Sequence, residues 1–155
     1  MDQRPSEARR SNREFLVVLF VGGALVVVGC LLPFSEFVMA IAPFPEGNDT
    51  TVSGYETDSG KVLLGMGVVL LACAYAIGRA RPEVMKLAAA LALAVAAGAA
   101  LITVSAFTGG SPPVIEGFGG FAAGRPAVGY YFALVGSFLA LASAAVLALQ
   151  VLRER

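Results

Sequence analysis

Four long stretches of this chain carry no formal charge. They are residues 15–35, 62–78, 87–115 and 126–152, and all 11 basic and all 11 acidic side chains lie outside them. An α-helix rises about 1.5 Å per residue, so crossing a hydrocarbon core about 30 Å thick takes about 20 apolar residues, with about 17 as the lower limit. Each stretch is long enough for one crossing. The sequence therefore predicts an all-α fold, a four-helix transmembrane bundle with two outer loops.

The composition leaves no room for a separate soluble domain. Of the 155 residues, 57% are hydrophobic and 14% are charged, whereas soluble domains carry about 25% charged residues. Pro33 is expected to end the first helix, and glycines and prolines from Gly109 onward divide the third charge-free stretch into helix and loop. The predicted organisation is a cytoplasmic disordered tail, one transmembrane domain and a short cytoplasmic tail: 1–14, 15–152 (spans about 15–32, 62–78, 87–107 and 127–152) and 153–155.

The distribution of basic residues predicts the orientation. Lys61 and Arg125 belong to the loops 33–61 and 108–127, and the other nine lie at the opposite ends of the spans. Those nine are Arg4, Arg9, Arg10, Arg13, Arg79, Arg81, Lys86, Arg153 and Arg155. Short segments rich in Lys and Arg stay in the cytoplasm. We therefore expect a multi-pass protein of the cell membrane with both termini cytoplasmic. The N-terminal arginines are expected to contact anionic headgroups and no nucleic acid.

Small residues predict how the helices pack. Helices in lipid gain little by burying apolar surface against each other, so close approach through small side chains holds them together. The third and fourth predicted helices carry such residues at four-residue spacing, and we expect these two helices to pack tightly. Whether one row also faces a second copy of the chain is left open. The predicted packing residues are Ala92, Ala96, Gly98, Ala100, Gly136, Ala140 and Ala144.

The residue types present exclude several chemistries. The chain has no histidine, which removes the imidazole ligand of haem, zinc and copper and the usual general base. No Asp, Glu, Lys or Arg lies in a predicted span, although proton relays and ion-coupled carriers depend on such charges. We therefore expect no enzyme, no catalytic residue, no cofactor and no metal.

Two other functions are weaker interpretations. A channel or carrier for a small neutral or apolar solute is the alternative, and the residues that would line it are Thr103, Ser105, Tyr130 and Tyr131. An enzyme at the outer surface ranks third, and its candidate residues are Glu46, Lys61, Glu116 and Arg125.

The predicted outer loops contain apolar residues that belong to no span. Such residues either lie in the headgroup layer, as aromatic belts do, or bind a partner, and the headgroup interpretation is favoured here. The predicted contact residues are Phe37, Met39, Ile41, Phe44, Phe118 and Phe121. The acidic residues of the first loop lack EF-hand spacing, so a calcium site is the least favoured interpretation.

The first predicted helix also contains a segment that resembles the cleavage site of a lipoprotein. This segment is 27–30, with the sequence Val-Val-Gly-Cys. Cleavage there would remove residues 1–29 and lipidate Cys30, leaving three spans. Leu31 and Leu32 continue the apolar run where a lipoprotein usually turns polar. We therefore expect the uncleaved form.

The order of features resembles the small four-span membrane proteins of actinobacteria and haloarchaea. The resemblance rests on Pro33-Phe34 after the first span, on the stretch 54–60 (GYETDSG) before the second, and on the glycine-rich entry to the fourth. It implies a four-span architecture and a prokaryotic origin, and it implies no activity. Together these patterns predict a structural or accessory subunit of a membrane assembly. Its expected partners are the lipid bilayer and either another membrane protein or a second copy of the chain.

Overall fold

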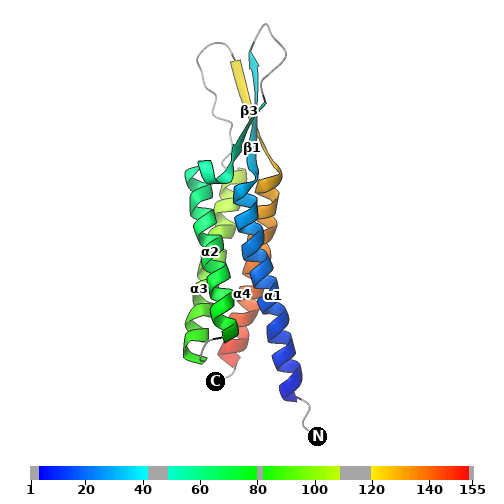
Figure 1. The fold of residues 1–155 in the computed structure, drawn as a ribbon, viewed down its shortest axis with the longest axis vertical. Helices are drawn as coiled ribbons and strands as arrows, with labels where there is room; N and C mark the ends of the chain where they lie inside the picture. Colours follow the sequence, from blue (N-terminus) through cyan, green and yellow to red (C-terminus); the bar gives the residue numbers. More distant parts are fainter. Residues whose placement is uncertain (1–3, 42–48, 80–81, 109–119, 154–155) are drawn as a thin grey trace.

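The computed structural model describes residues 4–41, 49–79, 82–108 and 120–153. Four helices run side by side along the long axis of the molecule: α1 (Arg4–Leu31), α2 (Asp58–Arg79), α3 (Pro82–Thr108) and α4 (Val128–Arg153). Each contains a segment long and apolar enough to cross a membrane. The four-helix prediction is confirmed. Both termini lie at one end of the bundle, and a small sheet extends from the other end (Figure 1).

The helices form a closed ring in which each one packs on its neighbours in the chain. The contacts join α1 to α2, α2 to α3, α3 to α4 and α4 back to α1. Buried leucines and alanines fill the middle of the ring, including Leu19, Leu70 and Ala92. The large apolar side chains on the outside of the bundle, such as Leu87 and Leu101, are exposed. An apolar exterior of this kind suits a lipid solvent, in which no hydrophobic gain comes from turning these residues inward.

The helices extend beyond the predicted spans. Helix α1 begins at Arg4, so the prediction of a disordered tail over 1–14 is wrong from residue 4 onward. Pro5 lies in the first turn, where no backbone donor is lost. Once the span is helical, each added residue extends an existing helix and needs no new nucleus. Helix α3 begins at Pro82, ahead of the expected 87, with Pro82 and Glu83 in a favourable first turn.

The segments expected to be loops contain three strands. They are β1 (Pro33–Ile41), β2 (Asp49–Ser53) and β3 (Gly120–Pro126), and a short 3-10 turn, η1 (Gly54–Glu56), follows β2. The strands form one antiparallel sheet with the order β2-β1-β3. The central strand β1 carries the apolar run after Pro33, whose aromatic and β-branched residues favour strands. The described parts of the two segments that were expected to be outer loops are therefore joined into one sheet.

The closest approach between helices joins α1 to α4 at glycines. A Cβ atom placed on Gly29 would lie 2.6 Å from both the carbonyl oxygen of Gly129 and the amide nitrogen of Ala133. A Cβ atom on Gly22 would lie 2.8 Å from the carbonyl oxygen of Gly136. Real Cβ atoms essentially never come closer than 3.0 Å, so the two backbones touch only because these positions lack side chains.

This contact adds to the predicted packing of the fourth helix. Gly136 and Ala140 were expected to face the third helix. Their backbone atoms lie against Gly22 of α1, and Ala140 also belongs to the core cluster that contains Ala92 and Ala96 of α3. The reason is geometric: α1 and α4 each carry two glycines seven residues apart, so the antiparallel helices meet at two levels along one face. Helix α4 thus packs on α3, as predicted, and it also makes a glycine contact with α1 that was not predicted.

Substitution of Gly29 by Ala should destabilise the bundle by about 2 kcal/mol, because the new methyl group meets rigid backbone atoms of α4. Gly65→Ala is the matched control, since Gly65 lies in α2 with no atom within 4 Å of an added Cβ. We expect Gly65→Ala to be neutral or to stabilise the helix by up to about 1 kcal/mol. Unfolding of both variants by sodium dodecyl sulfate in mild detergent measures the difference, and equal stabilities would contradict the glycine contact.

Candidate functional site

The site begins where the sheet joins the bundle, at the end opposite the termini. Phe34 is 7% exposed, and its ring packs edge-on against Tyr130 of α4 with 5.5 Å between the ring centroids. The carbonyl oxygen of Phe34 also accepts a hydrogen bond of 3.1 Å from the amide of Ala127. A ring contact and a backbone bond thus fix the start of β1 on α4.

The turn between β2 and α2 fastens the other side of the junction. The Ser53 amide donates to Glu56 Oε2 at 3.0 Å, and the Thr57 hydroxyl donates to the carbonyl oxygen of Gly54 at 2.8 Å. The same hydroxyl oxygen accepts the Gly60 amide at 3.0 Å and so caps the first turn of α2. Gly54 itself is buried, and an added Cβ would lie 2.8 Å from Cys30 Cα. The turn therefore closes over the C-terminal end of α1.

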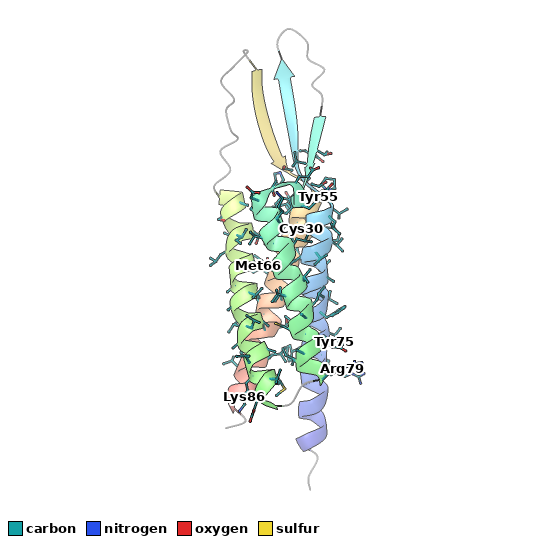
Figure 2. The ribbon with its side chains drawn as sticks, turned by 60° about the vertical axis from the view of Figure 1, so that its left-hand side comes forward. Cys30, Tyr55, Met66, Tyr75, Arg79 and Lys86 are labelled. Carbon is teal, nitrogen blue, oxygen red and sulfur yellow. The ribbon has the colours of Figure 1, made fainter. Side chains whose placement is uncertain are left out.

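Cys30 lies inside this junction (Figure 2). It is a free, fully buried cysteine in a cluster with Phe34 and Tyr130. Cleavage before Cys30 would remove the part of α1 that carries Gly22 and Gly29, two of the residues in contact with α4. The uncleaved chain is thus the form in which this packing exists, and the absence of cleavage stays a prediction.

Hydroxyl groups join α3 and α4 below the junction. Tyr130 is 3% exposed, and its hydroxyl donates to the backbone carbonyl of Thr103 at 2.7 Å. The Thr103 and Ser137 hydroxyls lie 3.3 Å apart, and each also contacts a carbonyl oxygen of its own helix. Each of these buried hydroxyls thus has a partner inside the protein. They hold two helices together, as hydroxyl groups in membrane helices commonly do.

The register of the sheet determines which residues share a face. Successive residues of a strand alternate between faces, and residues directly opposite on paired strands share one. Phe37, Met39 and Ile41 of β1 therefore occupy one face, where the opposing positions of β3 are Gly124, Ala122 and Gly120. Large apolar residue types on β1 thus lie beside small ones on β3.

The other face of the sheet has a different composition. It holds Glu36 and, directly opposite, Arg125; further along, Val38 and Ala40 lie opposite Ala123 and Phe121. Phe121 is therefore on the face opposite Phe37, Met39 and Ile41. The structure brings three of the six predicted contact residues together and places a fourth apart. Phe44 and Phe118 lie outside the described residues.

The sheet extends away from the bundle along its long axis (Figure 1). A strand rises about 3.3 Å per residue, so position 39 lies about 16 Å and position 41 about 23 Å along β1 from Phe34. The polar layer on each side of a bilayer is only about 5–8 Å thick. If Phe34 and the helix ends mark the edge of the hydrocarbon, Met39 and Ile41 lie beyond the headgroups.

The predicted packing residues lie at several different interfaces. Ala92, Ala96, Ala140 and Ala144 belong to the buried core, and Ala100 is buried as well. Gly98 of α3 faces α2, where an added Cβ would lie 3.2 Å from Met66 Cε. The outward positions Ala90 and Ala94 of α3 are exposed, so contact with a second copy through this row stays an open prediction.

Among the residues of the channel interpretation, Tyr130 bonds to the Thr103 carbonyl and packs edge-on against the Tyr131 ring. Tyr131 is half exposed on the outside of α4, and Ser105 is exposed with its hydroxyl donating to the carbonyl of Ile102. Lys61 pairs with Asp58 at 3.2 Å on the surface of α2. Glu46 and Glu116 lie outside the described residues. Within the described part of the chain, no three His, Cys, Asp or Glu residues are close enough to hold a metal ion.

The sequence contained a signal for the strands that the prediction did not use. Residues 34–41 combine aromatic and β-branched residues over a strand-like length. The partner strand 120–126 carries two glycines and two alanines, and this composition does not favour a strand by itself. This segment becomes a strand by pairing with β1, which lies about 80 to 90 positions earlier in the chain.

Comparison of the sequence with models of known protein families and with curated protein sequences finds no match. The fold and the junction therefore define the class: a bundle of four apolar helices of membrane-spanning length, with a three-stranded sheet on one end. The resemblance to four-span proteins of actinobacteria and haloarchaea stays a prediction.

Removal of the Tyr130 hydroxyl should weaken the contact between α3 and α4. We expect Tyr130→Phe to lower the free energy of unfolding by about 1 kcal/mol, because the Thr103 carbonyl loses a buried donor. Tyr131→Phe is the control, since this neighbouring ring is 50% exposed and the change leaves the junction intact. Detergent unfolding of the two variants tests this, and equal losses would argue against the buried bond.

Proposed function

We propose that this chain is a non-enzymatic, multi-pass protein of the cell membrane that acts as an accessory subunit through its outer sheet. Four apolar helices of spanning length support residence in a membrane. The excess of basic residues at the end that carries both termini supports a cytoplasmic location for that end. The sheet then lies outside the cell.

The observation that carries the partner proposal is the projection of the sheet (Figure 1). Apolar residues in a headgroup layer need to stay within about 8 Å of the hydrocarbon, and β1 is long enough to take Met39 and Ile41 well past that distance. Contact with another protein therefore fits the position of Met39 and Ile41 better than contact with lipid does. A face with three large apolar residue types is typical of a surface that another protein covers.

A channel or carrier receives less support. The hydroxyls that would line its path are used inside the bundle: Tyr130, Thr103 and Ser137 bond to one another or to backbone carbonyls. Tyr131 lies on the outside. A water-lined path needs polar groups directed at a common space, and these residues are instead directed at neighbouring helices or at lipid.

The position of the sheet relative to lipid can be measured, because the chain has no tryptophan. Met39→Trp and Tyr131→Trp each introduce one fluorescent reporter, the first in β1 and the second at the outer end of α4. In bilayers with brominated acyl chains, we expect strong quenching at position 131 and little at position 39. Quenching of both positions to the same extent would instead support contact between the sheet and the headgroup layer.

A charge on the apolar face should release the partner. We expect the wild-type chain, solubilised from its native membrane in mild detergent, to have a mass above its own 15.9 kDa by light scattering after correction for detergent. Met39→Glu should lower that mass to a monomer, because burying an unpaired carboxylate in an interface is costly.

Ala40→Glu is the matched control for this experiment. It adds the same charge at the next position of β1, which the register puts on the other face. Equal effects of the two substitutions would contradict a one-faced interface. Repeated recovery of the wild-type chain as a lone monomer would contradict the accessory role.

A further inference from the structure

The two ends of α2 differ in how their basic residues are neutralised. Lys61 at the sheet end forms an ion pair of 3.2 Å with Asp58, one turn away. Arg79 at the other end has no ion pair among the described residues, and its recorded contacts are with Tyr75 alone. One end of the helix therefore carries a positive charge that the described part of the protein leaves without a counter-charge.

The distance along α2 places Arg79 at the edge of the hydrocarbon. Eighteen residues separate Lys61 from Arg79, which is about 27 Å at a rise of 1.5 Å per residue. A hydrocarbon core is about 30 Å thick. If Lys61 lies at the outer boundary, Arg79 lies at the inner one, close to the phosphates, and Tyr75 lies one turn deeper.

Tyr75 holds the guanidinium in a defined position. The carbon at the centre of the Arg79 guanidinium lies 4.8 Å from the centroid of the Tyr75 ring, and one terminal N–H donates to the Tyr75 hydroxyl. Tyr75 is 61% exposed, so the pair lies on the outside of the bundle, where lipid has access (Figure 2). The contact uses one of five guanidinium N–H donors and leaves the others for a ligand.

We propose that Tyr75 and Arg79 form a binding site for the phosphate group of an anionic phospholipid in the leaflet opposite the sheet. A planar guanidinium matches two phosphate oxygens with parallel hydrogen bonds. The Tyr75 hydroxyl, which accepts from Arg79, can donate its own proton to a third oxygen. An anionic headgroup is preferred to a zwitterionic one because it brings no ammonium group to compete for the phosphate. The proposal rests on the proposed membrane location and is independent of the partner.

Lipid binding by the full chain in detergent tests the site. Native mass spectrometry counts the lipids bound as phosphatidylglycerol or phosphatidylcholine is added to the micelles, and inorganic phosphate is a third arm. We expect wild-type chain to retain phosphatidylglycerol in preference to phosphatidylcholine and to show no binding of inorganic phosphate at millimolar concentration. Arg79→Gln should weaken phosphatidylglycerol binding roughly tenfold, the loss of one charge-assisted pair.

Matched variants distinguish binding at a specific Tyr75–Arg79 site from attraction by positive charge alone. Lys86→Gln removes a basic residue from the same end of the bundle, on α3, where no aromatic contact is recorded (Figure 2). It should change the affinity less than twofold. Arg79→Lys keeps the positive charge but loses the paired N–H donors of the guanidinium. Tyr75→Leu removes the ring that positions the guanidinium. Both substitutions should weaken phosphatidylglycerol binding severalfold. Equal effects of Lys86→Gln and Arg79→Gln, or equal binding of the two lipids, would overturn the proposal.

A separate measurement distinguishes failure of this site from failure of the membrane assignment. Wild-type chain should stay in the membrane fraction after washing with alkaline carbonate, and so should Arg79→Gln. A chain that stays in the membrane but shows no lipid preference would contradict the phosphate site alone. A chain that carbonate releases would contradict the membrane location, and the phosphate site with it.

Discussion

The contact between the backbones of α1 and α4 is the constraint on which the rest of the structure depends. Lipid offers the helices no hydrophobic gain for meeting, so dispersion between closely packed atoms has to supply the attraction, and it falls off within a fraction of an ångström. Gly22 and Gly29 bring α1 against Gly136 and Gly129. This contact closes the ring of helices and brings the outer end of α1 beside that of α4, so that β1 and β3, which are continuous with those two ends, can pair.

The contacts at the junction fix the sheet on the helix bundle. A three-stranded sheet without a packed layer of its own is only marginally stable in water. Here β1 is fixed by the Phe34 ring on Tyr130 and by the bond from Ala127, and β2 is fixed by the turn that ends at Thr57. Strands that are weak by themselves are thus held at one end by the helices, and the sheet can extend from the end of the bundle (Figure 1).

The sequence was sufficient to predict the number and approximate positions of the four helices, because each charge-free stretch is long enough for one membrane crossing. It predicted the contact between α3 and α4 but not the one between α1 and α4, because spacing alone does not tell which small-residue rows meet. Each of α1 and α4 has a pair of glycines seven residues apart in the sequence. The alanines of α3 are more numerous, and the prediction was based on them. The strands were missed for a related reason: 120–126 becomes a strand only through β1, which lies far away in the chain.

The contacts inside the bundle make its two ends the better candidates for a functional site. The buried hydroxyls of Thr103, Ser137, Ser143 and Tyr130 each donate to a backbone carbonyl within the protein, so their O–H donors are already in use. One end carries a sheet with an apolar face, and the other carries a guanidinium held by a tyrosine ring. In the proposed orientation these two features suit different partners, a protein at the sheet end and a lipid phosphate at the other end, and the bundle between them would keep both at fixed depths in the membrane.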